Sequence, residues 1–267
     1  MKNVKPGFLI FFLVILISCA TVPLTGRKQI NLVGDSEVNA SAAQSYKQLL
    51  SDPSTKVISN TTDAQRVKRV GNQLATAIEK YLKENGYGDQ YSFQWEFNLI
   101  QSKEVNAWCM PGGKVAVYSG ILPVTMDDAG LATVMGHEIG HAIARHSAER
   151  ISQQMAAQAG GSLVGVATSN KSQATQAIVN QLYGVGGQLV LLKYSRNQES
   201  EADRLGLTFM AMAGYDPNNA VLFWQRMAAQ NKGGAPPEFL STHPADATRI
   251  EDIKNRIPEA MKYYHRK

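Results

Sequence analysis

The hydrophobic positions of the chain follow helical spacing over several long stretches. Between residues 63 and 85, apolar residues recur every three or four positions, which predicts an amphipathic helix capped by Asp63 and ended by Gly86. The same spacing runs through residues 127–143, and two aspartates at its start suit the positive end of a helix. Shorter helices are expected near residues 37–50, 198–213, 218–231 and 245–256.

Two other stretches favour β-strands. Residues 91–101 are rich in aromatic and β-prone residues, and residues 114–118 alternate weakly after a pair of glycines. A small sheet is therefore expected before the helix of residues 127–143. Residues 152–188 are heavy in Ala, Gln, Gly and Ser, which predicts short helices that form either a gating lid or weakly packed filler.

The N-terminus has the layout of an export signal. Lys2 and Lys5 precede an apolar run over residues 8–17, which is too short to span a bilayer. The run ends in Leu16-Ile17-Ser18-Cys19, which resembles a bacterial lipobox, so Cys19 is expected to carry a lipid at the mature N-terminus. The alternative is an ordinary secretory signal in which the cysteine falls by chance.

Composition narrows the function classes. A chain of 267 residues with 44% hydrophobic residues can bury a core. The net charge of +5 falls to +3 without residues 1–18, which carry two lysines and no acid, and no basic patch with interleaved aromatics suggests nucleic-acid binding. Lipidation of Cys19 would leave Cys109 as the single thiol, which fits a buried apolar residue better than a nucleophile.

The strongest chemical signal is His137-Glu138-Ile139-Gly140-His141. Histidines four residues apart lie on one face of a helix, so His137 and His141 can present ring nitrogens to one metal ion. Glu138 lies beside them, where it would act as a general base on water and then return the proton to a leaving amine. The motif predicts one Zn²⁺ per chain and peptide-bond hydrolysis.

A third zinc ligand is expected on another helix, where residues 197–203 read Asn-Gln-Glu-Ser-Glu-Ala-Asp. Glu199 and Asp203 share a helix face, whereas Glu201 is rotated by about 200°. We therefore assign Glu199 as the ligand and Asp203 as the acceptor that orients a ligating histidine, with Glu201 as the alternative ligand. His146, about 140° around the helix from His141, is not expected at the metal.

Together these segments resemble the gluzincin metallopeptidases, a family that includes the HtpX heat-shock protease, the CAAX prenyl endopeptidases and bacterial outer-membrane quality-control proteases. The resemblance covers residues 63–257 and includes Arg145-His146, the segment 106–113, Thr242-His243-Pro244 and Arg249. It implies an α+β fold, mostly helical, with a small β-sheet and the zinc-binding helix in the core. It also implies that Glu199 is the third ligand, that Asp203 has a catalytic role, and that His243 is an active-site histidine. His243 would either stabilise the oxyanion or cap the zinc in a resting state.

The expected organisation is a signal peptide at 1–18, a lipid-anchored tether and helix at 19–62, and a metallopeptidase domain at 63–267. The absence of long apolar spans is unlike the membrane-embedded members, and the chain resembles the small single-domain lipoprotein proteases. One strand is a candidate site for an extended substrate, either as an exposed edge strand or as an ordinary covered one. It comprises Gly113, Lys114, Val115, Ala116, Val117 and Tyr118.

The expected function is cleavage of unfolded or misassembled envelope proteins. Ala20 after the lipobox, rather than Asp, favours the periplasmic face of a bacterial outer membrane. The alternatives are a zinc-bound, chaperone-like assembly factor with suppressed proteolysis, a different zinc hydrolase such as an aminopeptidase, and an inert structural lipoprotein. The oligomeric state does not follow from the sequence.

Overall fold

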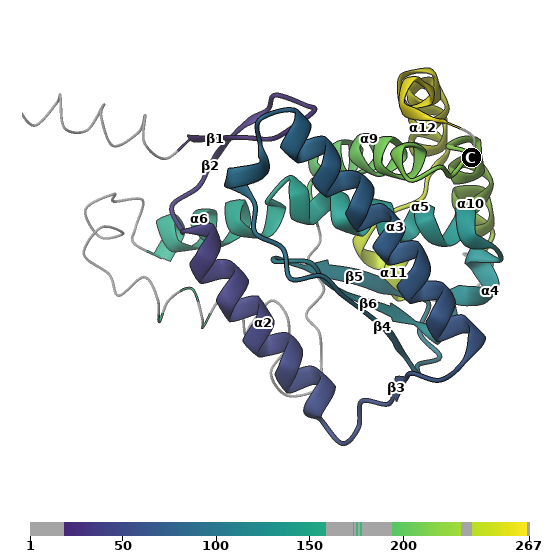
Figure 1. Cartoon of the computed structure of the whole chain (residues 1–267), viewed down its shortest axis with the longest axis horizontal. Helices are drawn as coiled ribbons and strands as arrows, with labels where there is room; N and C mark the ends of the chain where they lie inside the picture. Colours follow the sequence, from purple (N-terminus) through teal and green to yellow (C-terminus); the bar gives the residue numbers. More distant parts are fainter. Residues whose placement is uncertain are drawn as a thin grey trace, which may run out of the picture.

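The computed structural model describes residues 19–158, 194–230 and 237–265, with positions 173, 175 and 177 between them. The predicted signal peptide and most of the predicted lid segment 152–188 lie outside the described residues. Within the described part, every helix is too short or too polar to cross a membrane. The helices and a small sheet confirm the α+β class predicted from the sequence (Figure 1).

The main sheet has four strands in the order β3-β4-β6-β5. They are β3 (Val57–Ile58), β4 (Glu96–Ile100), β5 (Ala107–Met110) and β6 (Lys114–Tyr118). Strands β4 and β6 run parallel, and the other two pairs are antiparallel. The prediction that residues 113–118 form an exposed edge strand is therefore wrong, because β6 is paired on both sides and fully buried.

The sheet is covered on both faces. Val115 and Val117 of β6 point into the core shared with α3 (Thr62–Glu84) and α5 (Asp128–Ile143). Ala116 and Tyr118 point to the opposite side, toward α2 (Asp35–Ser51) and α6 (His146–Gln158). Figure 1 shows α2 on one side of the sheet and α3 and α5 on the other. This two-sided burial explains why the strands alternate so weakly in sequence.

Helix α5 lies at the centre of the molecule. Its N-cap Asp127 accepts a hydrogen bond from the Gly130 backbone amide, and nearly every residue along the helix is buried. Helix α9 (Arg196–Met212), which starts with a capping box between Ser195 and Gln198, packs along it. The remaining elements are η1 (Gly88–Gln90), η2 (Ser119–Ile121), α4 (Leu122–Thr125), α10 (Asn218–Ala229), α11 (Glu238–Thr242), α12 (Ala247–Ala260) and η3 (Met261–Tyr263).

The cap of one helix and the path of the chain after another differ from those expected. Helix α3 is capped by Thr61, whose side chain accepts from the Ala64 amide, so Asp63 lies in the first turn instead. Helix α5 ends at Ile143, and Arg145 adopts a φ of +52°, which turns the chain before α6 begins at His146. His146 is consequently not on the helix of His141, as its angular position in the sequence argument had assumed.

The segment predicted to begin as a tether is folded onto the rest of the molecule. A hairpin of β1 (Cys19–Thr21) and β2 (Lys28–Ile30) leads into α2, and β3 joins the main sheet. Val22, between the two hairpin strands, is completely buried in the main core. The domain boundaries stay predictions, but residues 19–62 contribute three strands and a helix to the fold.

Candidate metal centre

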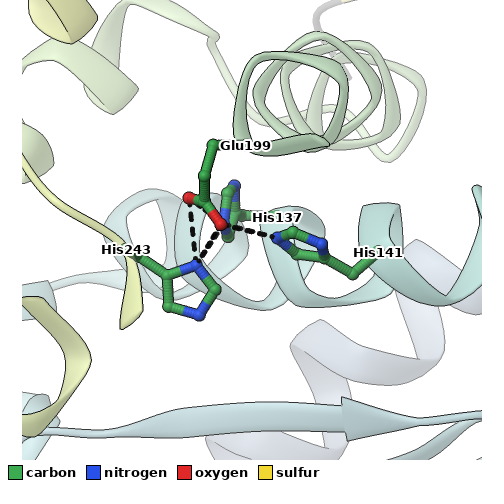
Figure 2. A group of neighbouring side chains, drawn as sticks. All are labelled: His137, His141, Glu199 and His243. Carbon is green, nitrogen blue, oxygen red and sulfur yellow. Dashed lines mark hydrogen bonds and ion pairs between the residues drawn. The ribbon is translucent and has the colours of Figure 1, made fainter. Parts of the chain in front are cut away.

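Two histidines of α5 form the floor of the candidate site. His137 and His141 are buried, and their Nε2 atoms lie 3.1 Å apart. This closeness follows from their spacing, since positions four apart stack on one face of a helix. Both rings point toward α9 (Figure 2).

Glu199 and His243 complete the group from two other elements. Glu199, in the first turn of α9, places its carboxylate oxygens 3.5 Å from His137 Nε2 and 3.4 Å from His141 Nε2. His243, directly after α11, places Nδ1 2.8 Å from Glu199 Oε1 and 3.1 Å from His137 Nε2. Figure 2 shows the four side chains converging from three segments of the chain.

The four donor atoms fit a zinc ion. Each residue offers one ligand atom, and all four atoms lie within 4.8 Å of one another in a buried setting. Ligands at typical Zn–N and Zn–O distances around a tetrahedral zinc are separated by about 3.3 Å, close to the spacings found here. Imidazole nitrogens and a carboxylate oxygen are also the donor atoms that zinc binds in proteins.

Asp203 and Arg249 support the ligands from behind. Asp203 Oδ1 lies 2.9 Å from His137 Nδ1, so it accepts a hydrogen bond from the Nδ1–H group. The Nε2 lone pair of His137 is then free to bind a metal ion. Arg249 donates to both oxygens of Asp203 at 2.8 Å and lies 3.0 Å from Glu199 Oε2. Its guanidinium also stacks 3.6 Å over the Trp224 ring. The pair thus fixes His137 and Glu199 together.

Glu138 has the environment of a general base. It is 4% exposed, and among the described residues its Oε1 has no hydrogen-bond partner. Burial raises the pKa of its carboxyl above the ordinary value, although the nearby histidines pull in the opposite direction. A raised pKa brings a carboxylate closer to the range in which it accepts and returns a proton at neutral pH.

The electrostatics of the other groups match their contacts. Burial raises the pKa of Glu199, but His243 and the hydrogen bonds from the two α5 histidines outweigh it, so the pKa falls below its ordinary value. Burial lowers the pKa of His137, but Asp203 and Glu199 raise it to about 9. His141, without an acid at its Nδ1, has its pKa lowered by burial.

Comparison with known proteins places this donor set in a family. Residues 63–257 match peptidase family M48. This chain belongs to peptidase family M48. The gluzincin family predicted from the sequence is thereby confirmed, and so is its zinc cofactor.

Relatives of this M48 peptidase come from bacteria and mitochondria. Metalloprotease YcaL of Escherichia coli is 28% identical over 96% of this chain and 98% of its own length. Mitochondrial metalloendopeptidase OMA1 of Schizosaccharomyces pombe is 34% identical over 90% of this chain and 67% of its own. A putative beta-barrel assembly-enhancing protease of Vibrio cholerae is 36% identical over 60% of this chain. The chain spans only part of the length of the longer relatives: 49% of OMA1 of Saccharomyces cerevisiae and 34% of the Vibrio protein.

With the family and the donor set together, the chain is a zinc metallopeptidase, and its relatives include proteins named metalloendopeptidases. The structure brings together the predicted residues His137, Glu138, His141, Glu199, Asp203 and His243. The predicted substrate strand is not available for pairing, since β6 lies inside the sheet with β5 as its outer neighbour. Glu201, the alternative ligand, points away from the group and contacts His146 instead.

Sequence reasoning missed several parts of this M48 site. Arg249 entered only as part of the family motif, and Trp224 not at all, although both pack behind the ligands. Tyr194 stacks on His141 with ring centroids 3.9 Å apart. No local pattern marks these residues, because each is brought in from a distant part of the chain. Cys109 is buried as predicted, and burial, with a smaller effect from Glu138, raises the pKa of its thiol.

Proposed function

We propose that this chain is an endopeptidase of the bacterial envelope, held at the periplasmic face of the outer membrane by a lipid on Cys19, which cleaves unfolded or misassembled envelope proteins. One observation carries the catalytic part. The buried carboxylate of Glu138 lies beside a complete set of zinc donors, and among the described residues its Oε1 has no hydrogen-bond partner. This is the arrangement that activates a water for attack on a peptide carbonyl.

The chain's own residues divide the work as follows. His137, His141 and Glu199 would hold the zinc, which supplies Lewis acidity toward a water and a carbonyl oxygen. Glu138 accepts the proton of the attacking water and later delivers it to the leaving amine. Asp203 and Arg249 keep His137 and Glu199 in place while charge develops. His243 Nε2 lies 3.6 Å from Glu138 Oε1. If the His243 side chain moved out of the donor group, it would be close enough to donate to the oxyanion that forms from the peptide carbonyl.

The outer edge of β5 is the better place for an extended substrate than β6. In an antiparallel pair the backbone groups of alternate residues face the partner strand. Because the Tyr118 amide donates to Asn106, the backbone groups of Ala107 and Cys109 face away from β6. All four residues of β5 are buried and the Ala107 amide donates to Asn106 Oδ1, so a substrate strand would have to displace that side chain. β5 also packs on α5, the helix that carries Glu138. A peptide paired there would add as a strand, a mode that recognises backbone more than side chains and so suits unfolded proteins.

The envelope setting rests on the N-terminal sequence and on the relatives. Two lysines, an apolar run over residues 8–17 and then Cys19-Ala20 have the layout of a bacterial export and lipidation signal. The match to YcaL covers nearly the full length of both chains, which supports the small single-domain subgroup. The Vibrio relative is named for enhancing beta-barrel assembly, which supports substrates among assembling envelope proteins. Mitochondrial relatives share the catalytic segment, so the leader is what favours the bacterial compartment.

The test of the proposed activity is digestion of unfolded casein and of an internally quenched peptide whose two ends are blocked. Wild-type protein should cleave both, a zinc chelator should stop cleavage, and Glu138→Gln should lower the rate by about 10²- to 10⁴-fold while zinc stays bound. Exposed Glu84→Gln, on α3, is the matched control and should retain full activity. Cleavage of only unblocked peptides would point to an exopeptidase and overturn the proposal.

A second candidate function has one observation in its favour. His243 Nδ1 sits among the donor atoms, where it would fill the fourth corner of a zinc site and exclude water. This is the arrangement expected of an assembly factor with suppressed proteolysis. The two candidates separate in cells: full complementation of a deletion strain by Glu138→Gln would favour the assembly factor, and loss of complementation the protease.

A further inference from the structure

A line of polar contacts leads from His141 away from the metal centre. His141 Nδ1 lies 2.8 Å from His146 Nδ1, and His146 Nε2 lies 3.0 Å from Glu201 Oε2. All three side chains are buried, and His146 is completely so. His146 can occupy this place because the positive φ of Arg145 ends α5 and turns the chain back over His141.

The line continues into the N-terminal hairpin. Thr25 donates to Glu201 Oε1 at 2.5 Å, and Arg27 Nε donates to Glu201 Oε2 at 2.6 Å. The other two nitrogens of Arg27 bind both oxygens of Glu149 on α6, at 3.0 and 3.1 Å. Thr25 and Arg27 both lie outside the segment 63–257 that matches the family.

The hydrogen-bonding capacity of each group sets the direction of every bond in this line. Glu201 receives donors from Thr25 and Arg27, so it acts as an acceptor and His146 must carry its proton on Nε2. A neutral His146 then has a lone pair on Nδ1, which accepts from His141. His141 is thereby left with its Nε2 lone pair free, on the side that faces the zinc donors.

We propose that His146 and Glu201 are positioning residues for the zinc ligand His141, and that Thr25 and Arg27 of the N-terminal hairpin hold Glu201 in this role. The two α5 ligands are then oriented by different means. Asp203 contacts His137 directly, whereas Glu201 acts on His141 through a second histidine. The hairpin that follows Cys19 becomes part of the support of the metal site. This inference rests on the zinc site of the proposed function but not on cleavage.

The test measures zinc affinity, by competition with a chromogenic chelator, together with the visible absorption of the cobalt-substituted protein. Outer groups that orient a ligating histidine typically change metal affinity by about 10- to 100-fold. His146→Leu should lose affinity in that range and shift the cobalt spectrum. His146→Asn should lose less, because its side-chain oxygen can take the place of Nδ1 as acceptor. Glu201→Gln and Arg27→Gln should lower affinity in the same direction, with the smaller effect from Arg27.

The matched control is Arg204→Ala, because Arg204 lies on the same helix as Glu201. This variant breaks an ion pair with Glu259 of α12 and should leave zinc affinity and the cobalt spectrum unchanged. Thermal unfolding of each metal-free variant separates loss of the ligand's orientation from loss of the fold. If His146→Leu does not fold, Glu201→Gln and Arg27→Gln decide the question.

Folded variants of His146 and Glu201 that bind zinc within about twofold of wild type, with the same cobalt spectrum, would overturn the proposal. Equal losses for His146→Asn and His146→Leu, in step with metal-free stability, would reduce it to a packing role and overturn it as well. A wild-type protein that binds zinc but cleaves nothing would refute the protease proposal alone. Failure of the wild type to bind zinc would refute both.

Discussion

Three of the four zinc donors are each held by a contact on the side away from the donor group. His137 is held by Asp203, His141 by His146, and Glu199 by Arg249, which lies 3.0 Å from its second oxygen. A side chain that is already held through its second polar atom loses little freedom when its first atom binds zinc. These contacts should therefore contribute to zinc affinity. Two predictions follow from single residues.

Asp203→Asn should weaken zinc binding by about 10- to 100-fold, because the amide can turn a donor toward His137 Nδ1 and lose the pairing with Arg249. Chelator competition measures the change. Asp89→Asn, an exposed acid in η1, is the control and should bind zinc like the wild type. Unchanged affinity in Asp203→Asn would show that His137 is oriented by packing alone.

His243→Ala should open the fourth corner of the donor set. If His243 caps the zinc, as in the second candidate function, zinc affinity should fall by about tenfold, because one donor is lost, and basal cleavage of the quenched peptide should rise, because water gains access. The measurement is the initial rate at saturating zinc. A variant with lower activity and unchanged zinc affinity would instead assign His243 to stabilising the oxyanion.

At the scale of the elements, the site depends on how closely α5 and α9 approach. A Cβ on Gly206 would lie 2.8 Å from the His137 backbone nitrogen, and one on Gly140 would lie 2.9 Å from the Ala202 carbonyl oxygen. Real side chains do not tolerate such contacts with backbone atoms, so glycine is needed at this crossing. The close approach is what brings Glu199 to the two histidines.

Gly206→Ala should therefore separate the two helices. Overpacking of this kind costs about 1–3 kcal/mol of folding stability, and zinc affinity should fall with it because Glu199 moves away from α5. Thermal unfolding and chelator competition measure the two effects. Gly34→Ala is the control, since its nearest neighbour is Ser36 Oγ at 3.8 Å. A Gly206→Ala protein with normal zinc affinity would show that the crossing tolerates the extra carbon.

At the scale of the whole molecule, the donor set joins three segments. His137 and His141 come from α5, Glu199 from α9, and His243 from the residue after α11. Support from Arg249 adds α12, and the line through His146 adds α6 and the N-terminal hairpin. Zinc would hold together elements from nearly the full length of the described chain.

Removal of zinc should consequently lower the melting temperature of the protein. Free zinc at 1,000 times its dissociation constant stabilises the folded state by about 4 kcal/mol, which corresponds to about 8–16 °C for a chain of this size. Scanning calorimetry with and without chelator measures the shift. Glu138→Gln should keep the full shift and His141→Ala should lose most of it. Equal melting temperatures in both conditions would mean that zinc does not link these segments.

The parts of the site that depend on local helix geometry could be predicted from the amino-acid sequence. The positions of His137, Glu138 and His141 on one helix, and the shared face of Glu199 and Asp203, follow from a repeat of about 3.6 residues per turn. The main helices followed from the same repeat, with boundaries displaced by a few residues, and the strand at 114–118 followed from a weak alternation after two glycines.

The contacts between distant segments could not be predicted in this way and are known only from the folded structure. In the structure β6 lies inside the sheet and β5 is the edge strand beside it. His243 Nδ1 lies among the zinc donors, and His146 forms a hydrogen bond with Glu201. Helical spacing describes one element at a time, so it assigned Glu201 a direction but no partner. The order of strands and the packing of α5 against α9 depend on how the whole core closes, which no short stretch of sequence encodes.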